Sequence, residues 1–100
     1  MKTSVFDAAN YIETPEDVVA YLNVVLEESG PAALIEAIGT VARSKGMTKI
    51  SERTGLKREG LYRSLSEGGN PSFVTVCKVL EACGMRLEIA QAEDKGLTIA

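Results

Sequence analysis

The sequence lacks the residues on which most enzymes and metal sites depend. It has no histidine and no tryptophan, and its two cysteines are Cys77 and Cys83. Histidine is the commonest acid–base residue in catalysis, and structural zinc sites are built mainly from Cys and His ligands. We therefore expect no catalytic residue, no metal site and no cofactor, and an enzyme is the least favoured class of function.

Two further absences concern nucleotide binding and disulfides. The adjacent glycines Gly68-Gly69 lack the sequence context of a phosphate-binding loop. Cys77 and Cys83 lie six residues apart, which turns their side chains about 240° apart on a helix, so they cannot form a disulfide within it. We expect both to be small buried apolar residues.

The chain also has no long apolar run. None of its segments approaches the ~20 apolar residues that cross a bilayer, and residues 1–13 contain no apolar core of a secretory signal. We expect no membrane partner and a cytoplasmic protein. One hundred residues suit a single domain. Its predicted parts are an N-terminal arm (1–13), an extra N-terminal helix (14–30), a main helical region (31–90) and a tail (91–100).

Helix start and stop signals divide the first half of the chain. Thr14 is a typical N-cap, and Pro15 fits the first turn because no N–H is needed there. This helix should end near Glu28, and Pro31 should begin a second helix that ends at 44–46. The predicted apolar faces are Val18, Leu22, Val25 and Leu26 in the first helix, and Leu34, Ile38, Val41 and Ala42 in the second.

The second half predicts three shorter helices and a strand. Thr48 is expected to cap a helix that runs to 53 or 54, and Gly55 fits a turn with positive φ, after which Leu56 enters the core. A fourth helix should run from Arg58 to 65 or 66. Ser72 should cap a fifth helix that Gly84 ends, with Phe73, Val76, Cys77, Leu80 and Cys83 on one face. Residues 85–89 alternate apolar and polar, which predicts a short C-terminal β-strand.

Charge is distributed unevenly along the chain, whose net charge is −3. Residues 1–40 hold seven acids and one base, whereas residues 41–78 hold eight bases and three acids, a local charge of +5. Screening acts over about 8 Å at physiological salt, so a partner responds to the local patch more than to the total. The middle of the chain can therefore bind a polyanion.

The basic region contains a helix, a short turn with glycine and a second helix, the pattern of a DNA-binding helix-turn-helix. On a helical wheel Leu61 and Leu65 share the inner face of the second helix, while Glu59 and Arg63 share the opposite face. Arginine suits guanine edges and an acid suits cytosine amino groups. Alternatively, Glu59 and Arg63 are only a solvated pair four residues apart on a helix.

The sequence also resembles known families. Residues 32–90 look like the Xre/Cro-type DNA-binding domain, which implies an all-α, five-helix Xre/Cro-like helix-turn-helix bundle. Nearly the whole chain resembles the HigA-type addiction module antidote proteins, most specifically in GLKREGLYRSLSEGGNP (55–71) and TVCKVLEACG (75–84). The resemblance implies a type II antitoxin that binds a small basic RelE/ParE-like toxin and represses its own operon. The acidic N-terminal third suits a basic toxin, although such acids are often merely solvated.

We expect a homodimer that places two recognition helices on operator double-stranded DNA, because two weak half-sites then act together. Arg58, Glu59 and Arg63 are the base-edge candidates, and Gly60 allows close approach. The predicted DNA-contact residues are Thr48, Lys49, Lys57, Arg58, Glu59, Gly60, Tyr62, Arg63, Asn70 and Ser72. Either the fifth helix or the terminal strand can supply the dimer surface.

Two other functions remain open at this point. The chain can be a stand-alone prophage-type repressor with no toxin partner, which the neighbouring gene would reveal. It can also be a protein-interaction module that keeps the helix-turn-helix shape without binding DNA. Binding that ignores salt would indicate the latter, because phosphate contacts make affinity fall steeply with salt.

Overall fold

The computed structural model of the chain describes residues 14–92. The predicted arm (1–13) lies outside the described residues, as does the tail beyond residue 92. All regular structure in the described part is helical, which confirms the all-α class. None of these helices is long and apolar enough to cross a membrane. The helices are α2 (Pro15–Ser29), α3 (Pro31–Lys45), α4 (Met47–Thr54), α5 (Arg58–Ser64) and α6 (Phe73–Ala82).

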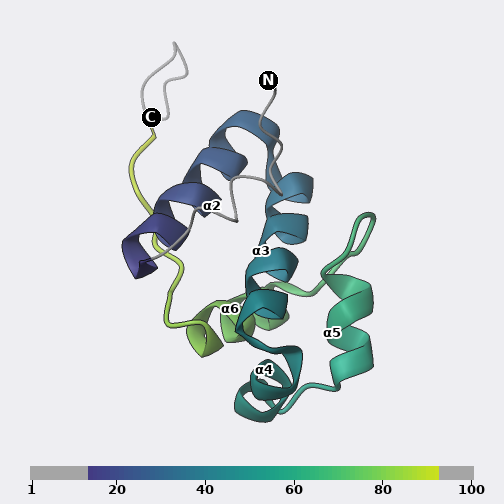
Figure 1. Cartoon of the computed structure of the whole chain (residues 1–100). Coiled ribbons are helices and arrows are strands. Elements are labelled where there is room, and N and C mark those ends of the chain that lie inside the picture. Colours follow the sequence, from purple (N-terminus) through teal and green to yellow (C-terminus); the bar gives the residue numbers. More distant parts are fainter. Residues whose placement is uncertain (1–13, 93–100) are drawn as a thin grey trace, which may run out of the picture.

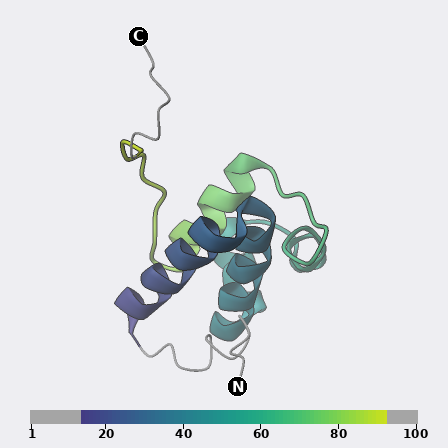
Figure 2. The same ribbon diagram turned by 90° about the horizontal axis from the view of Figure 1, so that it is seen from above.

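Helix α3 is the centre of the packing. It contacts α2, α4 and α6, while α4 also contacts α5 and α6. Seen in two views, α2 and α5 lie on opposite sides of α3 (Figure 1, Figure 2). The buried core comprises Tyr21, Leu22, Val25, Ala37, Ile38, Val41, Ala42, Met47, Ile50, Leu61, Leu65, Val79, Leu80 and Ala82.

The start of α2 follows the sequence prediction. The Thr14 hydroxyl accepts a hydrogen bond from the Asp17 backbone N–H at 3.1 Å, and the Asp17 carboxylate accepts one from the Thr14 N–H at 3.2 Å. This reciprocal capping box satisfies N–H groups that the first helical turn leaves unpaired. Pro15 occupies the first helical position, where its missing N–H costs nothing.

The cap predicted at Thr48 is wrong. The N-cap of α4 is Gly46, at φ 102°, and the helix begins at Met47. The Met47 side chain is buried in the core, which fixes the start of the helix one residue before Thr48. Thr48 therefore lies inside the first turn, and its hydroxyl is available for another contact.

The predicted strand at residues 85–89 does not form. After α6 the chain turns at Gly84, where φ is 86°, and residues 85–92 have no regular structure. A strand needs a hydrogen-bonded neighbour, and no other strand lies within residues 14–92 to pair with it.

Two members of the predicted apolar faces are exposed. Leu26 in α2 is 42% exposed because the inner face of that helix is centred on Tyr21, Leu22 and Val25. Phe73 in α6 is 71% exposed. It is the first residue of that helix and lies two helical turns, about 10 Å along the axis, before the buried Leu80.

Candidate nucleic-acid interface

A three-residue turn joins α4 to α5. Gly55 takes the left-handed conformation at φ 76°, and its N–H donates to the Ser51 carbonyl at 2.9 Å. The Ser51 hydroxyl donates to the Leu56 carbonyl, and the Leu56 N–H donates to the Thr54 hydroxyl at 3.1 Å. Leu56 itself packs half-buried against the core. These contacts fix the direction in which α5 leaves the turn.

Helix α5 is held by the two leucines that the sequence predicted. Leu61 and Leu65 are almost fully buried, with exposed fractions of 1% and 0%. Gly39 of α3 also lies close by, since a Cβ added there would come within 2.2 Å of the Leu65 carbonyl oxygen. Glycine is needed at this position for the chain after α5 to approach α3.

The outer face of α5 is polar and open. Glu59, Tyr62 and Arg63 are exposed. Glu59 and Arg63 do not form the ion pair that their spacing allows, since the one salt bridge within the described residues joins Arg86 and Glu88. Both charged groups therefore point to solvent without a protein ion-pair partner, which does not favour the solvated-pair alternative.

Gly60 leaves a gap in this face. A Cβ built on Gly60 would meet only the Arg63 guanidinium, at 3.9 Å. The backbone of the helix is therefore accessible to an incoming ligand at this point. The close approach predicted for Gly60 is sterically possible.

Arg58 and Thr48 lie together at the first turns of α5 and α4. The Arg58 guanidinium donates to the Thr48 hydroxyl at 2.9 Å, and both residues are exposed. This bond links two predicted contact residues that are ten positions apart in the sequence. Nothing in the sequence pattern pointed to it, because it depends on how the turn brings the helix ends together.

The predicted phosphate contacts fall into two groups. Lys49 and Lys57 are exposed near the Arg58–Thr48 pair, Lys49 in α4 and Lys57 at the N-cap of α5. Asn70 and Ser72 are exposed in the loop that leaves the other end of α5 (Figure 1). The Ser72 hydroxyl already caps α6, accepting from the Thr75 N–H at 3.0 Å. The structure therefore distributes the predicted contact residues over both ends of α5.

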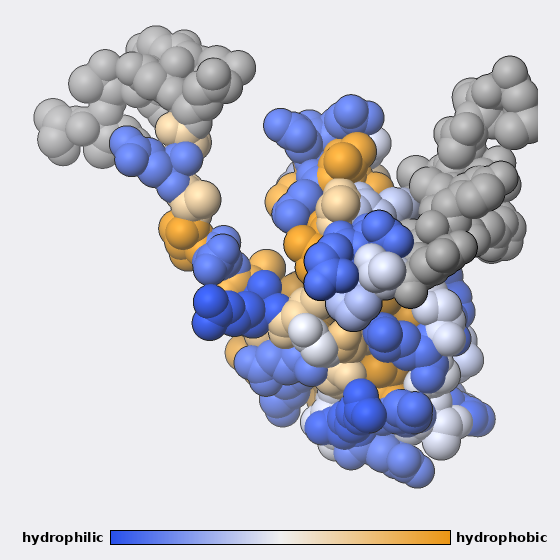
Figure 3. All heavy atoms as spheres, turned by 60° about the vertical axis from the view of Figure 1, so that its left-hand side comes forward, coloured by the Kyte–Doolittle hydropathy of each residue, from blue (hydrophilic) through white to orange (hydrophobic). Residues whose placement is uncertain are grey.

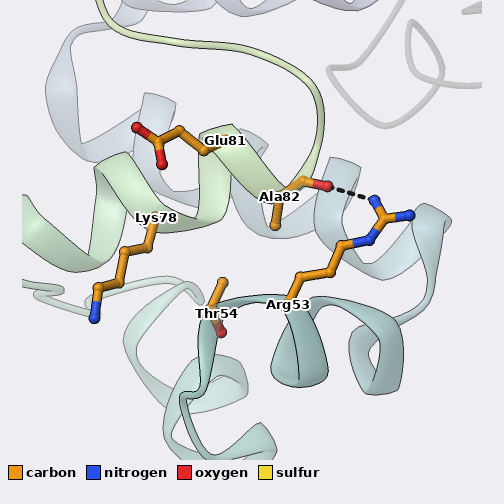
Figure 4. Close-up of a pocket in the computed structure, with 5 residues that line it drawn as sticks. All are labelled: Arg53, Thr54, Lys78, Glu81 and Ala82. Carbon is orange, nitrogen blue, oxygen red and sulfur yellow. Dashed lines mark hydrogen bonds between the residues drawn. The ribbon is translucent and has the colours of Figure 1, made fainter.

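Arg53 has a structural contact that sequence reasoning did not foresee. Its guanidinium donates to the Ala82 carbonyl at 2.8 Å and so joins the end of α4 to the end of α6. These two residues line a hollow with Thr54, Lys78 and Glu81 (Figure 4). The Lys78 and Glu81 side chains point in different directions there. Over residues 14–92, no group of three or more His, Cys, Asp or Glu residues gathers to bind a metal.

The buried Tyr21 and the half-buried Cys83 have shifted pKa values, and both lie outside the predicted contact residues. Burial, together with the nearby Glu36 carboxylate, raises the pKa of Tyr21. Burial also raises the pKa of the Cys83 thiol, against the opposing effect of Lys45 and Arg53. Cys77 and Cys83 are free thiols and half-buried. Neither shift creates a reactive group on the α4–α5 surface.

Known proteins similar to this chain were found by sequence. The model of a family described as "probable addiction module antidote protein" matches residues 2–91. An uncharacterized protein of Haemophilus influenzae is 38% identical over 87 residues, which cover 87% of this chain and 90% of that protein. No solved structure matches the chain.

Proposed function

Because the chain belongs to the family of probable addiction module antidote proteins, we propose that it is the DNA-binding antitoxin of a type II toxin–antitoxin module. In this proposal it neutralises a RelE/ParE-like toxin and represses its own operon as a homodimer. The family match over residues 2–91 is the observation that carries the antitoxin role. The same family points to a regulator without enzymatic activity.

The α4–turn–α5 geometry supports the DNA-binding part of the proposal. A helix-turn-helix places its second helix in the major groove, with the first residues of that helix on base edges. Helix α5 is fixed to the core by Leu61 and Leu65, and its opposite face carries Glu59 and Arg63 without ion-pair partners in the described chain. In this proposal the guanidinium groups of Arg58 and Arg63 donate to guanine edges, and the Glu59 carboxylate accepts from a cytosine amino group. Gly60 has no side chain and so lets the helix come close to the bases in the groove.

Phosphate contacts would come from the residues around this helix. Lys49 and Lys57 supply positive charge beside the first turn of α5. Phosphate contacts set orientation and affinity without reading the sequence. The Arg58–Thr48 bond, at 2.9 Å, holds the arginine near this end of the helix before DNA is bound.

Helix α2 is the proposed toxin-binding surface. It carries Glu16, Asp17, Glu27 and Glu28 and no basic residue. Beside these acids Val19 and Leu26 are exposed, so the outer face offers apolar area as well as negative charge. A toxin that acts on RNA must itself be basic where it meets RNA, and an acidic helix complements such a surface.

The salt dependence of binding to the promoter of its own operon tests the DNA-binding part. Each neutralised phosphate contributes about −0.9 to the slope of log affinity against log salt, so two lysines in each of two protomers predict a slope of about −3 to −4. A slope near zero would contradict DNA binding and favour a protein-interaction module. A steep fall of affinity with salt, together with a neighbouring gene that encodes no toxin, would favour a stand-alone repressor.

A further inference from the structure

The segment after α6 has the pattern of a strand but no neighbour. The Met85 N–H donates to the Leu80 carbonyl at 2.8 Å, and residues 86–92 make no backbone hydrogen bond within the described chain. Apolar residues at 85, 87 and 89 alternate with Arg86 and Glu88. Figure 3 shows an arm that stands clear of the helices, along which hydrophobic and hydrophilic residues follow one another.

The side chains of this segment are already sorted onto two sides. Arg86 and Glu88 form a salt bridge at 3.3 Å, which places both side chains on the same side of the chain. Residues two apart share a side when a segment is extended as a strand, so Met85, Leu87 and Ile89 would then share the other. Met85 packs half-buried against the core, whereas Leu87 is 43% and Ile89 97% exposed. The apolar side of the segment therefore contacts the core at Met85 and is exposed to solvent at Ile89.

We propose that residues 85–89 pair antiparallel with the same residues of a second copy of this chain, with Leu87 on the two-fold axis. In that register Met85 lies opposite Ile89 of the second copy. Arg86 lies opposite Glu88 of the second copy, and the symmetric pair repeats the contact. The segment is thus complementary to itself in both polarity and charge.

Neighbouring registers lose this complementarity. A shift of one residue places apolar side chains opposite charged ones, because side chains alternate with period two. A shift of two residues places Arg86 opposite Arg86, or Glu88 opposite Glu88, and like charges directly opposite are destabilising. A parallel pairing in register also brings like charges together. The sequence of the segment therefore selects one pairing.

Met85 is the residue at which the paired segments would contact the helical core. A two-stranded ribbon is marginally stable alone and needs a further surface to pack on. Met85 supplies a junction, because it contacts the core of its own protomer. The inference rests on the homodimer of the proposed function and identifies the surface that forms it.

Disulfide trapping tests the register. Leu87→Cys is made in a chain with Cys77→Ala and Cys83→Ala, so that position 87 holds the single thiol. Directly opposite residues have Cβ atoms about 4.5–5.5 Å apart, close enough for a disulfide after a small adjustment. Under mild oxidation at low protein concentration, we expect most of this variant to run as a covalent dimer on a non-reducing gel.

The matched control is Ile89→Cys in the same background. In the proposed register residue 89 faces residue 85 of the second copy, so this variant should remain largely monomeric under the same oxidation. Equal rates of dimer formation by the two variants would overturn the proposal, because random encounters of exposed arms would then explain both.

A charge exchange tests the same pairing without cysteine. Arg86→Glu and Glu88→Arg should each weaken the dimer at least tenfold in analytical ultracentrifugation, and the double variant should return to the wild-type dissociation constant. Unchanged dimerisation in the single variants, or a monomeric wild type, would overturn the proposal. Loss of the dimer in Phe73→Ser alone would assign the interface to α6 instead.

The proposed dimer surface and the proposed repressor function can be contradicted independently of each other. If wild type binds operator as a dimer but the variants at 86, 87 and 88 behave like it, the interface is elsewhere and the proposed function stands. If the variants behave as expected but wild type shows no salt-dependent binding to its promoter, the dimer stands and the repressor function fails.

Discussion

The residues of α5 and its C-cap Leu65 divide into a buried set and an exposed set. Leu61 and Leu65 are buried and hold the helix against the core, whereas Arg58, Glu59 and Arg63 are exposed to solvent. Substitutions on the outer face should therefore change binding with little effect on stability. Substitutions of the two leucines should change both, because truncating a buried leucine costs about 2–5 kcal/mol.

Arg58 and Lys49 should respond differently to truncation. A base-edge arginine contributes about 1–3 kcal/mol of discrimination, so Arg58→Ala should weaken operator binding by that amount and relax one base position. Lys49→Ala should weaken all DNA sequences alike and make the salt slope less steep by about one unit for each protomer. Binding to a panel of single-base operator variants measures both. Unchanged operator binding by Arg58→Ala would place the recognition surface elsewhere.

Gly60→Ala should have opposite effects on stability and binding. Alanine favours a helix over glycine by about 0.5–1 kcal/mol, and the added Cβ meets only the Arg63 guanidinium, at 3.9 Å. The melting temperature should therefore rise. Operator affinity should fall, since the methyl group would fill the gap through which DNA is proposed to approach the helix. Thermal melts and operator titrations of the same sample measure the melting temperature and the operator affinity. If both rise, Gly60 does not belong to the contact surface.

Tyr21→Phe addresses a buried hydroxyl that has no hydrogen-bond partner among the described residues. An unpaired buried polar group is destabilising, so its removal should raise the free energy of unfolding by about 1 kcal/mol at pH 7. The pKa of Tyr21 is raised above its usual 10.0 by burial and by Glu36. As pH rises above 10, the unfolded chain ionises first, and wild type should lose stability that the variant keeps. Urea unfolding at pH 7 and 10.5 compares them; the same pH dependence in both proteins would contradict this account.

At the scale of elements, the position of α5 depends on a close approach to α3. A Cβ at Gly39 would lie 2.2 Å from the Leu65 carbonyl oxygen, which is backbone and cannot rotate away. Gly39→Ala should therefore destabilise the fold by about 1–3 kcal/mol, although alanine favours the helix itself. Chemical denaturation measures the loss. Wild-type stability would mean that α5 can shift without cost.

The order of the helices and the starts of α2, α3 and α6 could be predicted from sequence because these ends carry local signals. Thr14 with Pro15, Gly30 with Pro31, and Ser72 each mark a helix start through their own backbone chemistry. The leucines that hold α5 followed from helical periodicity. Such features depend on residues a few positions apart, which a sequence displays directly.

Contacts between elements could not be predicted in the same way. The Arg58–Thr48 bond spans ten residues and the Arg53–Ala82 bond spans 29. Periodicity alone assigned Phe73 to the core, although it is 71% exposed at the first position of α6. The candidate contact residues were recognisable by type and spacing, but their grouping at the two ends of α5 required the fold.

For the whole molecule, the two proposed binding surfaces are separate. The acidic helix α2 and the polar face of α5 belong to elements on opposite sides of α3 (Figure 1, Figure 2). Because charge acts locally, an acidic surface on one side and basic residues on the other are compatible with the proposed binding of both a basic toxin and DNA by a chain of net charge −3. We expect toxin binding to leave the α5 face physically accessible.

The most direct test of the central claim is growth of cells that express the small open reading frame next to this gene, with and without this chain. The account predicts growth arrest when the neighbour is expressed alone, and recovery with a stable purified complex when the two are expressed together. A harmless neighbour, or an arrest that this chain does not relieve, would contradict the antitoxin function.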